Sequence, residues 1–428
     1  MLENKSEKRE MAISAIGNML VWYNFALFMP FLPILSKHFF PLENHVIRDM
    51  VTLVAMSMGL FIRPVGSVIF GPIGDKIGRE KAISLAVLLM AVPTFLIGLL
   101  PSYEQIGIWS PILLVLLRTC QGISMGGEYT AAMVHLVEIA PSNRRGFFGC
   151  LSDAGSQVGV LLSGEVLLLL HSFYSETEIY NNAWRIPFFF AIILVPFAFR
   201  RPQKKVEENT TKKITEKDKA KKGENIISKQ ESILSLLAKH KTEVLCTIAI
   251  TAFSAIAFYT LLNFLPYYLV NVGILSLKDS AICSVIANVC IIASILVSGF
   301  LSDLFSRKIF IQLGIICVTA VTYYVFLGDI KSPFVWFICH GVYGIFLGMY
   351  YGGRAAFFAE SFPKNIRCTG VSISLSLAQA IFGGGISIVL NYCISVSSFL
   401  VVLPITVVIV FALFAVTKIE DRTGQELI

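Results

Sequence analysis

The chain has 428 residues, of which 55% are hydrophobic and only 15% are charged, whereas an average soluble domain carries about 25% charged residues. Its mean hydropathy is +0.73, and its apolar residues form blocks of about 20, the length that a helix needs to cross a bilayer. These values exclude an ordinary soluble domain and indicate an integral membrane protein.

Twelve apolar blocks follow one another along the chain. They lie near residues 12–36, 50–70, 82–100, 108–137, 147–171, 184–199, 243–271, 280–301, 309–327, 334–361, 369–392 and 398–417. Each is expected to be a helix, because lipid offers no hydrogen-bond partner and a helix satisfies its own backbone. The first block follows a charged start but has no small-residue cleavage pattern behind it, so we expect a retained helix and not a signal peptide.

The basic residues predict which loops face the cytoplasm. If the amino terminus is cytoplasmic, 27 of the 35 Lys and Arg residues fall in the inner segments and five in the outer loops. Inner loops carry the excess of Lys and Arg, so we expect both termini inside, in a bacterial-type inner membrane. This topology explains the net charge of +7 without a nucleic-acid partner. The polar stretch 200–230 is expected to be a solvated linker, with contact to anionic lipid as the alternative.

Two loop motifs occur twice. GPIGDKIGREK after the second block aligns with GFLSDLFSRKI after the eighth, and EIAPSNRRG after the fourth aligns with ESFPKNIRC after the tenth. The first alignment places Gly71, Asp75 and Arg79 on Gly299, Asp303 and Arg307. Such repetition predicts two six-helix bundles that rock around a site at the midplane, as in transporters. We therefore expect an all-α fold with bundles at residues 1–200 and 243–428, joined by a cytoplasmic loop at 201–242.

The motifs resemble those of a known family. The loop G-x-x-x-D-K-x-G-R resembles the loop signature of the major facilitator superfamily, and RTCQG in the fourth block is similar to its R-x-x-Q-G motif. GNMLVWYNFALF, RPVGSVIFGPIGDKIGR, RTCQGISMGGEYTAA and AESFPKNIRCTGVS resemble the metabolite:proton symporter family, which includes proline/glycine-betaine, 2-oxoglutarate, citrate and shikimate permeases. The resemblance implies a twelve-helix fold and transport of a small metabolite, coupled to protons.

The repeated loop is interpreted as a gating latch. Asp75 and Asp303 stand where inner helix ends converge, so each carboxylate can accept backbone N–H bonds and oppose the positive end of a helix. The basic residues are expected to pair with acids or lipid phosphates. The resemblance implies that such loops close the cytoplasmic side, with the role shared by Gly71, Asp75, Lys76, Gly78, Arg79, Asp303 and Arg307. A simple tight turn is the alternative, and the second copy, with Leu304 and Ser306, is expected to latch less.

Ionisable residues inside apolar blocks are candidates for function, because each costs about 2.5 to 3.5 kcal/mol to insert. The resemblance implies a proton-coupling role for Arg118 in the R-x-x-Q-G motif. Arg63 is either a cavity residue or one that extends toward lipid headgroups. Asp153 is expected to be structural, and Arg354 to face a cavity.

The first apolar block departs from the family pattern. Family members commonly show E-W-F-D-F, whereas this chain reads VWYNF, with Val21 and Asn24 in place of two acids. Neither side chain can exchange a proton. If coupling is retained, Glu128 or Glu165 must carry it; an exchanger or facilitator without proton coupling is the alternative.

The predicted substrate site combines basic and aromatic residues. Arginine binds carboxylates through two hydrogen bonds, and aromatic faces hold amino or quaternary cations. We therefore expect a small carboxylate-bearing substrate, either a proline- or betaine-type zwitterion or an organic acid. The candidate residues are Trp22, Tyr23, Asn24, Arg118, Tyr259, Asn263 and Arg354.

Other functional classes lack their signatures in this sequence. The nine cysteines include no C-x-x-C, and no histidines stand at ligand spacing, so we expect no metal and no cofactor. There is no G-x-x-x-x-G-K-[ST] for an ATP-driven pump, no filter motif for a channel and no nucleophile cluster for an enzyme. A nutrient sensor that does not transport stays open. Gly122-xxx-Gly126 is interpreted as internal helix packing in a monomer.

Overall fold

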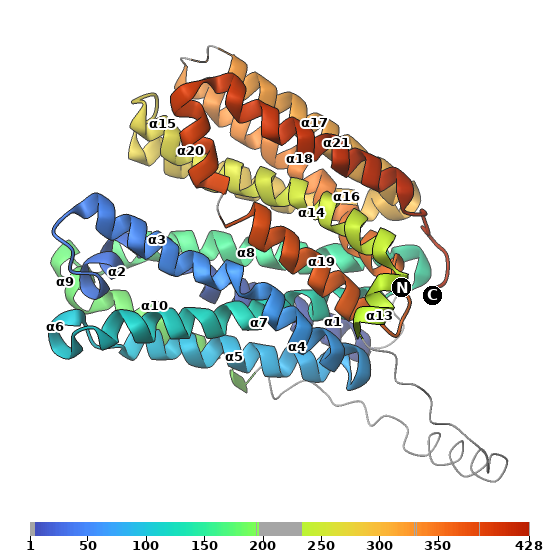
Figure 1. The fold of residues 1–428 in the computed structure, drawn as a ribbon, viewed down its shortest axis with the longest axis horizontal. Helices are drawn as coiled ribbons and strands as arrows, with labels where there is room; N and C mark the ends of the chain where they lie inside the picture. The colour runs from blue at the N-terminus through green and yellow to red at the C-terminus, as the bar shows by residue number, and fades with distance from the viewer. Residues whose placement is uncertain are drawn as a thin grey trace, which may run out of the picture.

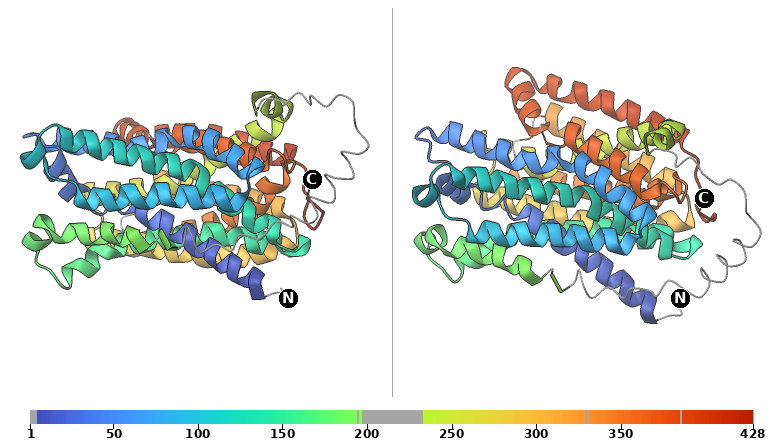
Figure 2. Two further views of the ribbon diagram at one scale, coloured as in Figure 1. Left: turned by 90° about the horizontal axis from the view of Figure 1, so that it is seen from below. Right: turned by 60° about the horizontal axis from the view of Figure 1, so that its bottom comes forward.

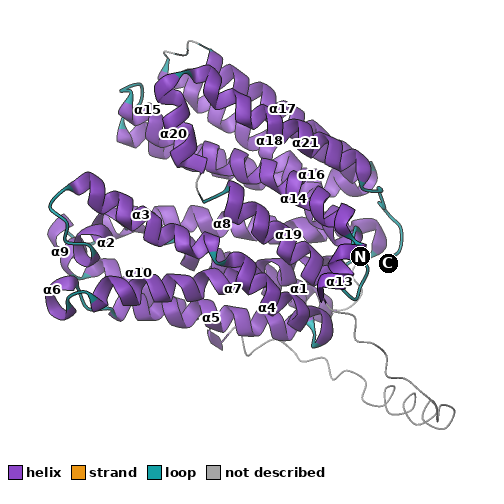
Figure 3. Ribbon diagram, viewed as in Figure 1, coloured by secondary structure: helices purple, strands orange, loops and turns teal. Residues whose placement is uncertain are grey.

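The computed structural model describes residues 5–193, 195–196, 233–328, 330, 332–384 and 386–427. Within these residues the chain forms helices and connecting loops, with no strand (Figure 3). The elements up to the central loop are α1 (Lys5–Ala26), α2 (Leu32–Phe39), α3 (His45–Phe61), α4 (Arg63–Lys76), α5 (Arg79–Leu99), α6 (Tyr103–Ile106), α7 (Trp109–Ile139), η1 (Ser142–Arg144), α8 (Arg145–His171), α9 (Glu176–Asn181), η2 (Ala183–Arg185), α10 (Ile186–Phe189) and η3 (Phe190–Ile193). We call them the first group.

The second group follows the central loop. Its elements are α13 (Ile233–Lys239), α14 (Lys241–Tyr259), the π-helical turn η4 (Thr260–Phe264), α15 (Leu265–Asn271), α16 (Leu277–Leu304), α17 (Arg307–Leu327), α18 (Pro333–Glu360), α19 (Arg367–Phe382), α20 (Ile386–Val396) and α21 (Ser398–Lys418). Most of the expected loop 201–242 lies outside the described residues, and its last part forms α13 and the start of α14. Eight helices of the described chain are long and apolar enough to cross a membrane on their own.

The predicted all-α class is confirmed, because a helix coincides with each of the twelve apolar blocks. Several blocks are not the single helices that we expected. The first is divided by the turn between α1 and α2, and the second is broken at Ile62. Pro64, in the first turn of α4, has no N–H to donate to the carbonyl of Leu60, so the helical hydrogen bonds are interrupted there. The eleventh is divided near Gly383, and the sixth is a run of short helices whose last residues lie outside the described chain.

Paired glycines set the close approach of helices in both groups. A Cβ atom at Gly126 would lie 2.2 Å from the backbone oxygen of Arg63, so α7 and α4 touch through their backbones. In the second group, a Cβ at Gly348 would lie 2.6 Å from the backbone oxygen of Ile291 on α16. Small residues permit this packing, and the internal repeat seen in the loops therefore extends to the helix contacts.

Both chain ends lie at one end of the helix bundle, on the right of Figure 1 and of both views in Figure 2. We call this end the terminal face. The two groups approach each other there and diverge toward the opposite face (Figure 1). Their contact is reciprocal, because α8 of the first group packs against α16 and α18, while α19 of the second group packs against α4.

Candidate functional site

The carboxylate of Asp75 caps a helix of the opposite group. Asp75 lies near the end of α4, and its oxygens accept hydrogen bonds from the backbone N–H groups of Cys368 and Thr369, at 2.9 and 2.8 Å, in the first turn of α19. The Thr369 hydroxyl donates a third bond at 2.6 Å, and Arg79 donates to the same carboxylate at 2.5 Å. Because helix N-termini carry unpaired N–H groups and partial positive charge, this carboxylate fastens α4 to α19.

Glu138 connects the same two groups. It stands at the end of α7, and its carboxylate accepts hydrogen bonds from Arg79 at 3.1 and 3.2 Å and from Arg367 of α19 at 2.7 Å. Arg79 belongs to the first group and Arg367 to the second. The carboxylate of Glu138 therefore bridges two guanidinium groups that would otherwise repel each other.

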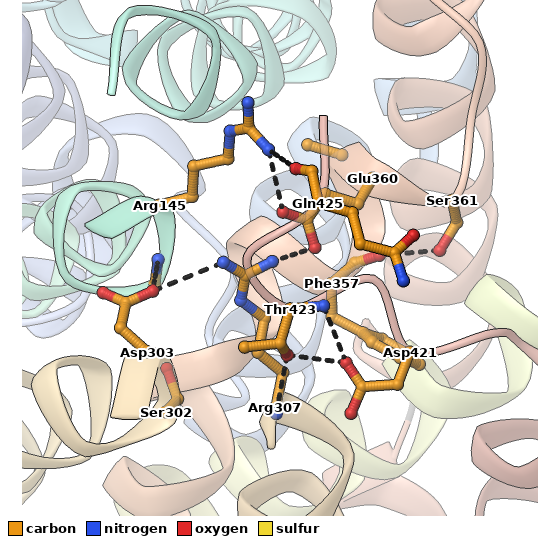
Figure 4. A network of polar contacts seen from close by, with 12 residues as sticks. Arg145, Ser302, Asp303, Arg307, Phe357, Glu360, Ser361, Asp421, Thr423 and Gln425 are labelled. Atoms are coloured by element: carbon orange, nitrogen blue, oxygen red, sulfur yellow. Dashed lines mark hydrogen bonds and ion pairs between the residues drawn. The ribbon is translucent and has the colours of Figure 1, made fainter. Parts of the chain in front are cut away.

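The second copy of the loop repeats this arrangement with the groups exchanged (Figure 4). Asp303, near the end of α16, accepts backbone hydrogen bonds from Gly146 and Phe147 at 2.6 and 2.8 Å, in the first turn of α8. Arg307 donates to both Asp303 and Glu360. Arg145 of the first group also pairs with Glu360, at 3.6 Å. Each group thus lends a carboxylate to a helix N-terminus of the other; we call the two copies together the reciprocal latch.

The second copy was expected to latch less. In the first copy the Thr369 hydroxyl also donates to Asp75. In the second copy the C-terminal tail supplies additional contacts. The Asp421 carboxylate accepts a hydrogen bond from Ser306. It also accepts one from Thr423, and Arg145 donates to the backbone oxygen of Gln425 (Figure 4). The tail therefore contacts both groups beside Asp303.

Removal of the Asp421 charge is expected to release the tail. Burial alone would raise the pKa of Asp421, but hydrogen bonds from Ser306 and Thr423 outweigh it and hold the pKa below its ordinary value. A depressed pKa contributes stability that is complete above about pH 4 and is lost as the pH falls through the folded value. At pH 7 we expect Asp421→Asn to speed amide hydrogen exchange in residues 420–427 about tenfold. Glu420→Gln is the control, because exposed Glu420 bonds Arg422 alone among its described neighbours. Equal exchange in both variants would contradict the expectation.

The glycines of the latch have different roles. Gly78 has a φ of +128°, a conformation that strongly favours glycine, so it serves the turn between α4 and α5. At Gly71 the α4 backbone closely approaches α19, since an added Cβ would lie 2.8 Å from the Cα of Thr369. Lys76, the last residue of α4, is exposed on the terminal face.

Gly71→Ala is expected to push α4 and α19 apart and to weaken closure of the terminal face. Overpacking of this kind costs about 1 to 3 kcal/mol, which is about a five- to hundredfold shift in an equilibrium. Labelling of a cysteine introduced at Lys364, beside the latch, should become correspondingly faster. Gly164→Ala is the matched control, because a Cβ there meets nothing within 4 Å. Unchanged labelling in Gly71→Ala would show that closure does not depend on this contact.

A buried ion pair joins the two groups deeper in the bundle. Arg354 of α18 donates hydrogen bonds to the Asp153 carboxylate on α8 and to the Tyr129 hydroxyl on α7. Its guanidinium lies 4.5 Å from the centroid of the Tyr351 ring. Arg354 and Asp153 are 2% and 3% exposed. The sequence placed Asp153 in a structural role near the surface, whereas the structure makes it the partner of Arg354.

Arg118 is buried against aromatic rings of the first group. Its guanidinium lies 4.7 and 4.6 Å from the ring centroids of Phe25 and Phe28. It donates to the backbone oxygen of Phe25 at 3.3 Å and to Gln121 at 2.8 Å. Asn24, at the position of a family acid, donates to the backbone of its own helix at Leu20, 2.7 Å away. Asn24 therefore gives Arg118 no negative charge.

Arg63 is the candidate that the sequence left open. It is 2% exposed, so its side chain does not extend to headgroups, and its guanidinium lies 6.0 Å from the centroid of the Trp22 ring. Its Nε and Nη1 atoms have no hydrogen-bond partner among the described residues. Trp22 in turn packs edge to face on Tyr129, with centroids 5.8 Å apart. The aromatic contact therefore links Arg63 to the Arg354 pair.

The remaining sequence candidates fall in different places. Tyr259 packs against a core cluster of the first group, as Trp22 also does. Tyr23 packs into the core of the first group with α2 and α8. Asn263 belongs to the π-helical turn, and its side chain lies outside the described residues. Glu128 is fully buried in α7, and Glu165 is half-buried in α8. The structure thus brings Trp22, Tyr259 and Arg354 toward the contact between groups.

No set of three or more His, Cys, Asp or Glu side chains in the described chain could hold a metal ion. A small cavity lies inside the second group, lined by residues that include Phe253, Thr322 and Tyr343. None of the predicted substrate-binding residues lines this cavity.

Comparisons with known proteins agree with this architecture. The family model described as the Major Facilitator Superfamily matches residues 14–388. The glycine betaine/proline/ectoine/pipecolic acid transporter OusA of Dickeya dadantii is 31% identical over 395 residues, which cover 88% of this chain and 75% of OusA. A proline/betaine transporter of Salmonella typhimurium is 30% identical over 402 residues, which cover 90% of this chain and 77% of the relative.

Solved structures share the fold at low sequence identity. The proton:xylose symporter XylE, bound to 6-bromo-6-deoxy-D-glucose, superimposes with a TM-score of 0.77 at 15% identity, covering 98% of this chain and 97% of that chain. XylE from E. coli in a partially occluded inward-open conformation gives 0.72 at 16%, covering 99% and 100%. With a family model over most of its length, two relatives of 30% identity or more and the reciprocal latch between two helix groups, this chain belongs to the Major Facilitator Superfamily of membrane transporters.

Proposed function

We propose that this transporter carries a small zwitterion of the proline or betaine class across the bacterial inner membrane, by alternating access and with proton coupling. The observation that carries the proposal is the reciprocal latch, in which Asp75 and Asp303 each cap a helix of the opposite group. The proposed state is closed at the terminal face and ready to receive substrate from the other side.

The chemistry of the latch suits a reversible gate. Hydrogen bonds from backbone N–H groups to carboxylates are strengthened by the charge, yet at a membrane surface water can replace them when the groups part. The Glu138 and Glu360 bridges add ion pairs between the groups. Opening therefore exchanges these bonds for hydration on one face, and the next closure restores them.

Orientation, assembly and lipid contact belong to the same proposal. The excess of Lys and Arg in alternate loops supports a cytoplasmic terminal face. The glycine pairs of α7 and α18 support a monomer, because they are occupied by helices of the same chain. Basic residues at the ends of the helices, including exposed Lys76, are proposed to contact lipid phosphates.

The proposed substrate class rests on the buried arginines and aromatic rings near the contact between the two groups. Arg63, Arg118 and Arg354 are buried cations that would attract a carboxylate, and the Nε and Nη1 atoms of Arg63 have no hydrogen-bond partner among the described residues. The ring of Trp22 beside Arg63 and the ring of Tyr259 offer faces for a substituted ammonium. The curated relatives are named as proline and betaine transporters. Tyr23, Asn24 and Asn263 complete the proposed substrate set.

An organic acid is the second candidate. It is favoured by the replacement of the two helix-one acids with Val21 and Asn24, which leaves no carboxylate there to hold a cationic group. For proton coupling, Arg118, Glu128 and Glu165 are the proposed participants from sequence. Glu128 is the more enclosed of the two acids.

The deciding experiment is a transport panel in proteoliposomes. Labelled proline, glycine betaine, 2-oxoglutarate and citrate are supplied with and without an inward proton gradient. We expect saturable uptake of proline or betaine that the gradient drives above equilibrium. Uptake of the organic acids alone would replace the zwitterion by the second candidate, and binding without uptake of any of the four would contradict a carrier.

A further inference from the structure

The Arg354–Asp153 pair is a charged contact between the groups away from the latch. Asp153 stands eight residues into α8, and Arg354 stands six residues before the end of α18. At 1.5 Å per residue, both lie about 10 Å inward from the latch. The pair therefore joins the two groups on the inner side of the latch when the terminal face is closed.

The surroundings of Asp153 are aromatic and polar. From α7, Tyr129 donates a hydrogen bond to its Oδ1 atom at 2.5 Å. From α18, Arg354 donates to the same atom, and Tyr350 and Tyr351 stand beside that guanidinium. The Oδ2 atom has no hydrogen-bond partner within the described chain.

Other helices that pack on α8 bring few charged groups near this carboxylate. On α16, Asp303 binds the first turn of α8, about two turns away from Asp153. On α1, uncharged Asn18 binds Ser152 and Ser156. On α8 itself, the thiol of Cys150 is the nearby titratable group. The guanidinium of Arg63 on α4 lies 6.0 Å from the centroid of the Trp22 ring, which packs on Tyr129.

Alternating access must separate this pair, because its two members belong to different groups. Separation of a buried ion pair with both charges intact is strongly unfavourable. A proton on Asp153 removes one charge, and a substrate carboxylate on Arg354 compensates the other. Opening of the terminal face then needs both ligands, which is the condition for symport.

We propose that Asp153 is the residue that binds the coupling proton, in place of the acids absent from helix one. The inference rests on the proposed function of a proton-coupled carrier. A hydronium ion from the side opposite the terminal face transfers its proton to Oδ2 of Asp153 and leaves water. The neutral acid releases Arg354, which then binds the substrate carboxylate. After the terminal face opens, the proton passes to water on that side, and the ion pair forms again when the empty carrier closes.

The placement distinguishes Asp153 from the acids that the sequence singled out. Glu165 lies twelve residues further along α8, about 18 Å away along the axis, and is half-buried. Glu128 precedes Tyr129 on α7 and so points about 100° away from it around the helix. Asp153 forms an ion pair with Arg354 of the opposite group, so its charge bears directly on the contact that must open.

Three transport measurements on Asp153→Asn test the inference, because asparagine imitates the protonated acid. We expect uptake driven by a proton gradient to fall at least tenfold and substrate-induced proton uptake to disappear. Counterflow, in which labelled substrate exchanges for unlabelled substrate without a gradient, should fall less than threefold. Asp279→Asn is the matched control at the N-terminus of α16, and it should keep all three. Asp153→Asn protein that still takes up substrate in response to a proton gradient would overturn the inference. If Glu165→Gln lost that response at the same time, Glu165 would be the coupling residue instead.

A second variant covers the case in which Asp153→Asn fails to fold. Asp153→Glu keeps the carboxylate but displaces it from Arg354, so the pH profile of uptake should move by at least half a pH unit. An unmoved profile in folded Asp153→Glu would overturn the inference. Wild-type protein that transports without proton movement would instead overturn the proton coupling in the proposed function.

Discussion

Asp75→Asn is expected to lower net uptake about tenfold or more while substrate affinity changes little. The substitution removes the charge that holds the first turn of α19 and pairs with Arg79. Hydrogen bonds to charged groups contribute about 1.5 to 3 kcal/mol each, so loss of one such contribution shifts the balance of closed and open states by about 10- to 100-fold. The closed state then forms too rarely for a full cycle. Uptake rates and equilibrium binding of the same labelled substrate measure the two effects separately.

The repeat supplies the internal comparison for Asp75. Asp303→Asn removes the equivalent charge from the other copy, at the first turn of α8, and is expected to impair cycling in the same direction. Asp279→Asn has the same chemistry outside the latch and should transport at the wild-type rate. Wild-type turnover in both latch variants would reduce these loops to simple turns.

Arg118→Ala is expected to abolish uptake, by about 30-fold or more, with the fold retained. Removal of one member of a buried, desolvated charge interaction costs about 2 kcal/mol or more. Arg118 has no carboxylate partner among the described residues, and its charge rests on the rings of Phe25 and Phe28. It is therefore available to a negatively charged ligand or to a change in the charge of the site.

Arg118→Met accompanies the alanine variant, because its chain fills the space between the rings without a charge. Both variants should lose uptake, while the methionine variant keeps the wild-type melting temperature within a few degrees. Uptake at the wild-type rate in the methionine variant would remove the Arg118 charge from the mechanism. If only Arg118→Ala lost uptake, and it also failed to fold, Arg118 would be a packing residue.

The fold was predictable because bilayer physics leaves few choices. Apolar blocks of spanning length have to be helices, and the loop repeat predicted two similar bundles. The breaks were less visible. Pro64 signals the break before α4, but the division near Gly383 has no proline, and glycine alone is common in membrane helices.

The latch was accessible to sequence reasoning, whereas the Arg354–Asp153 pair was not. Asp75 and Asp303 stand at helix ends within a repeated motif, so their chemistry follows from local position. The pairing of Arg354 with Asp153 depends on how α18 faces α8 across the two groups, and periodicity within one helix carries no information about the helix opposite. One signal was present in the sequence. An arginine inside an apolar block needs a partner of opposite charge, and Asp153 is an acid inside another apolar block.

The central claim is that the two groups rock about the contact between them. Paired spin labels test it most directly, after replacement of the nine native cysteines. One pair, at Lys76 and Lys364, spans the terminal face, and the other, at Leu42 and Asn271, spans the groups at the opposite face. Addition of substrate at acidic pH should lengthen the first distance and shorten the second. Two distances that stay fixed, or that change in the same direction, would contradict alternating access in this chain.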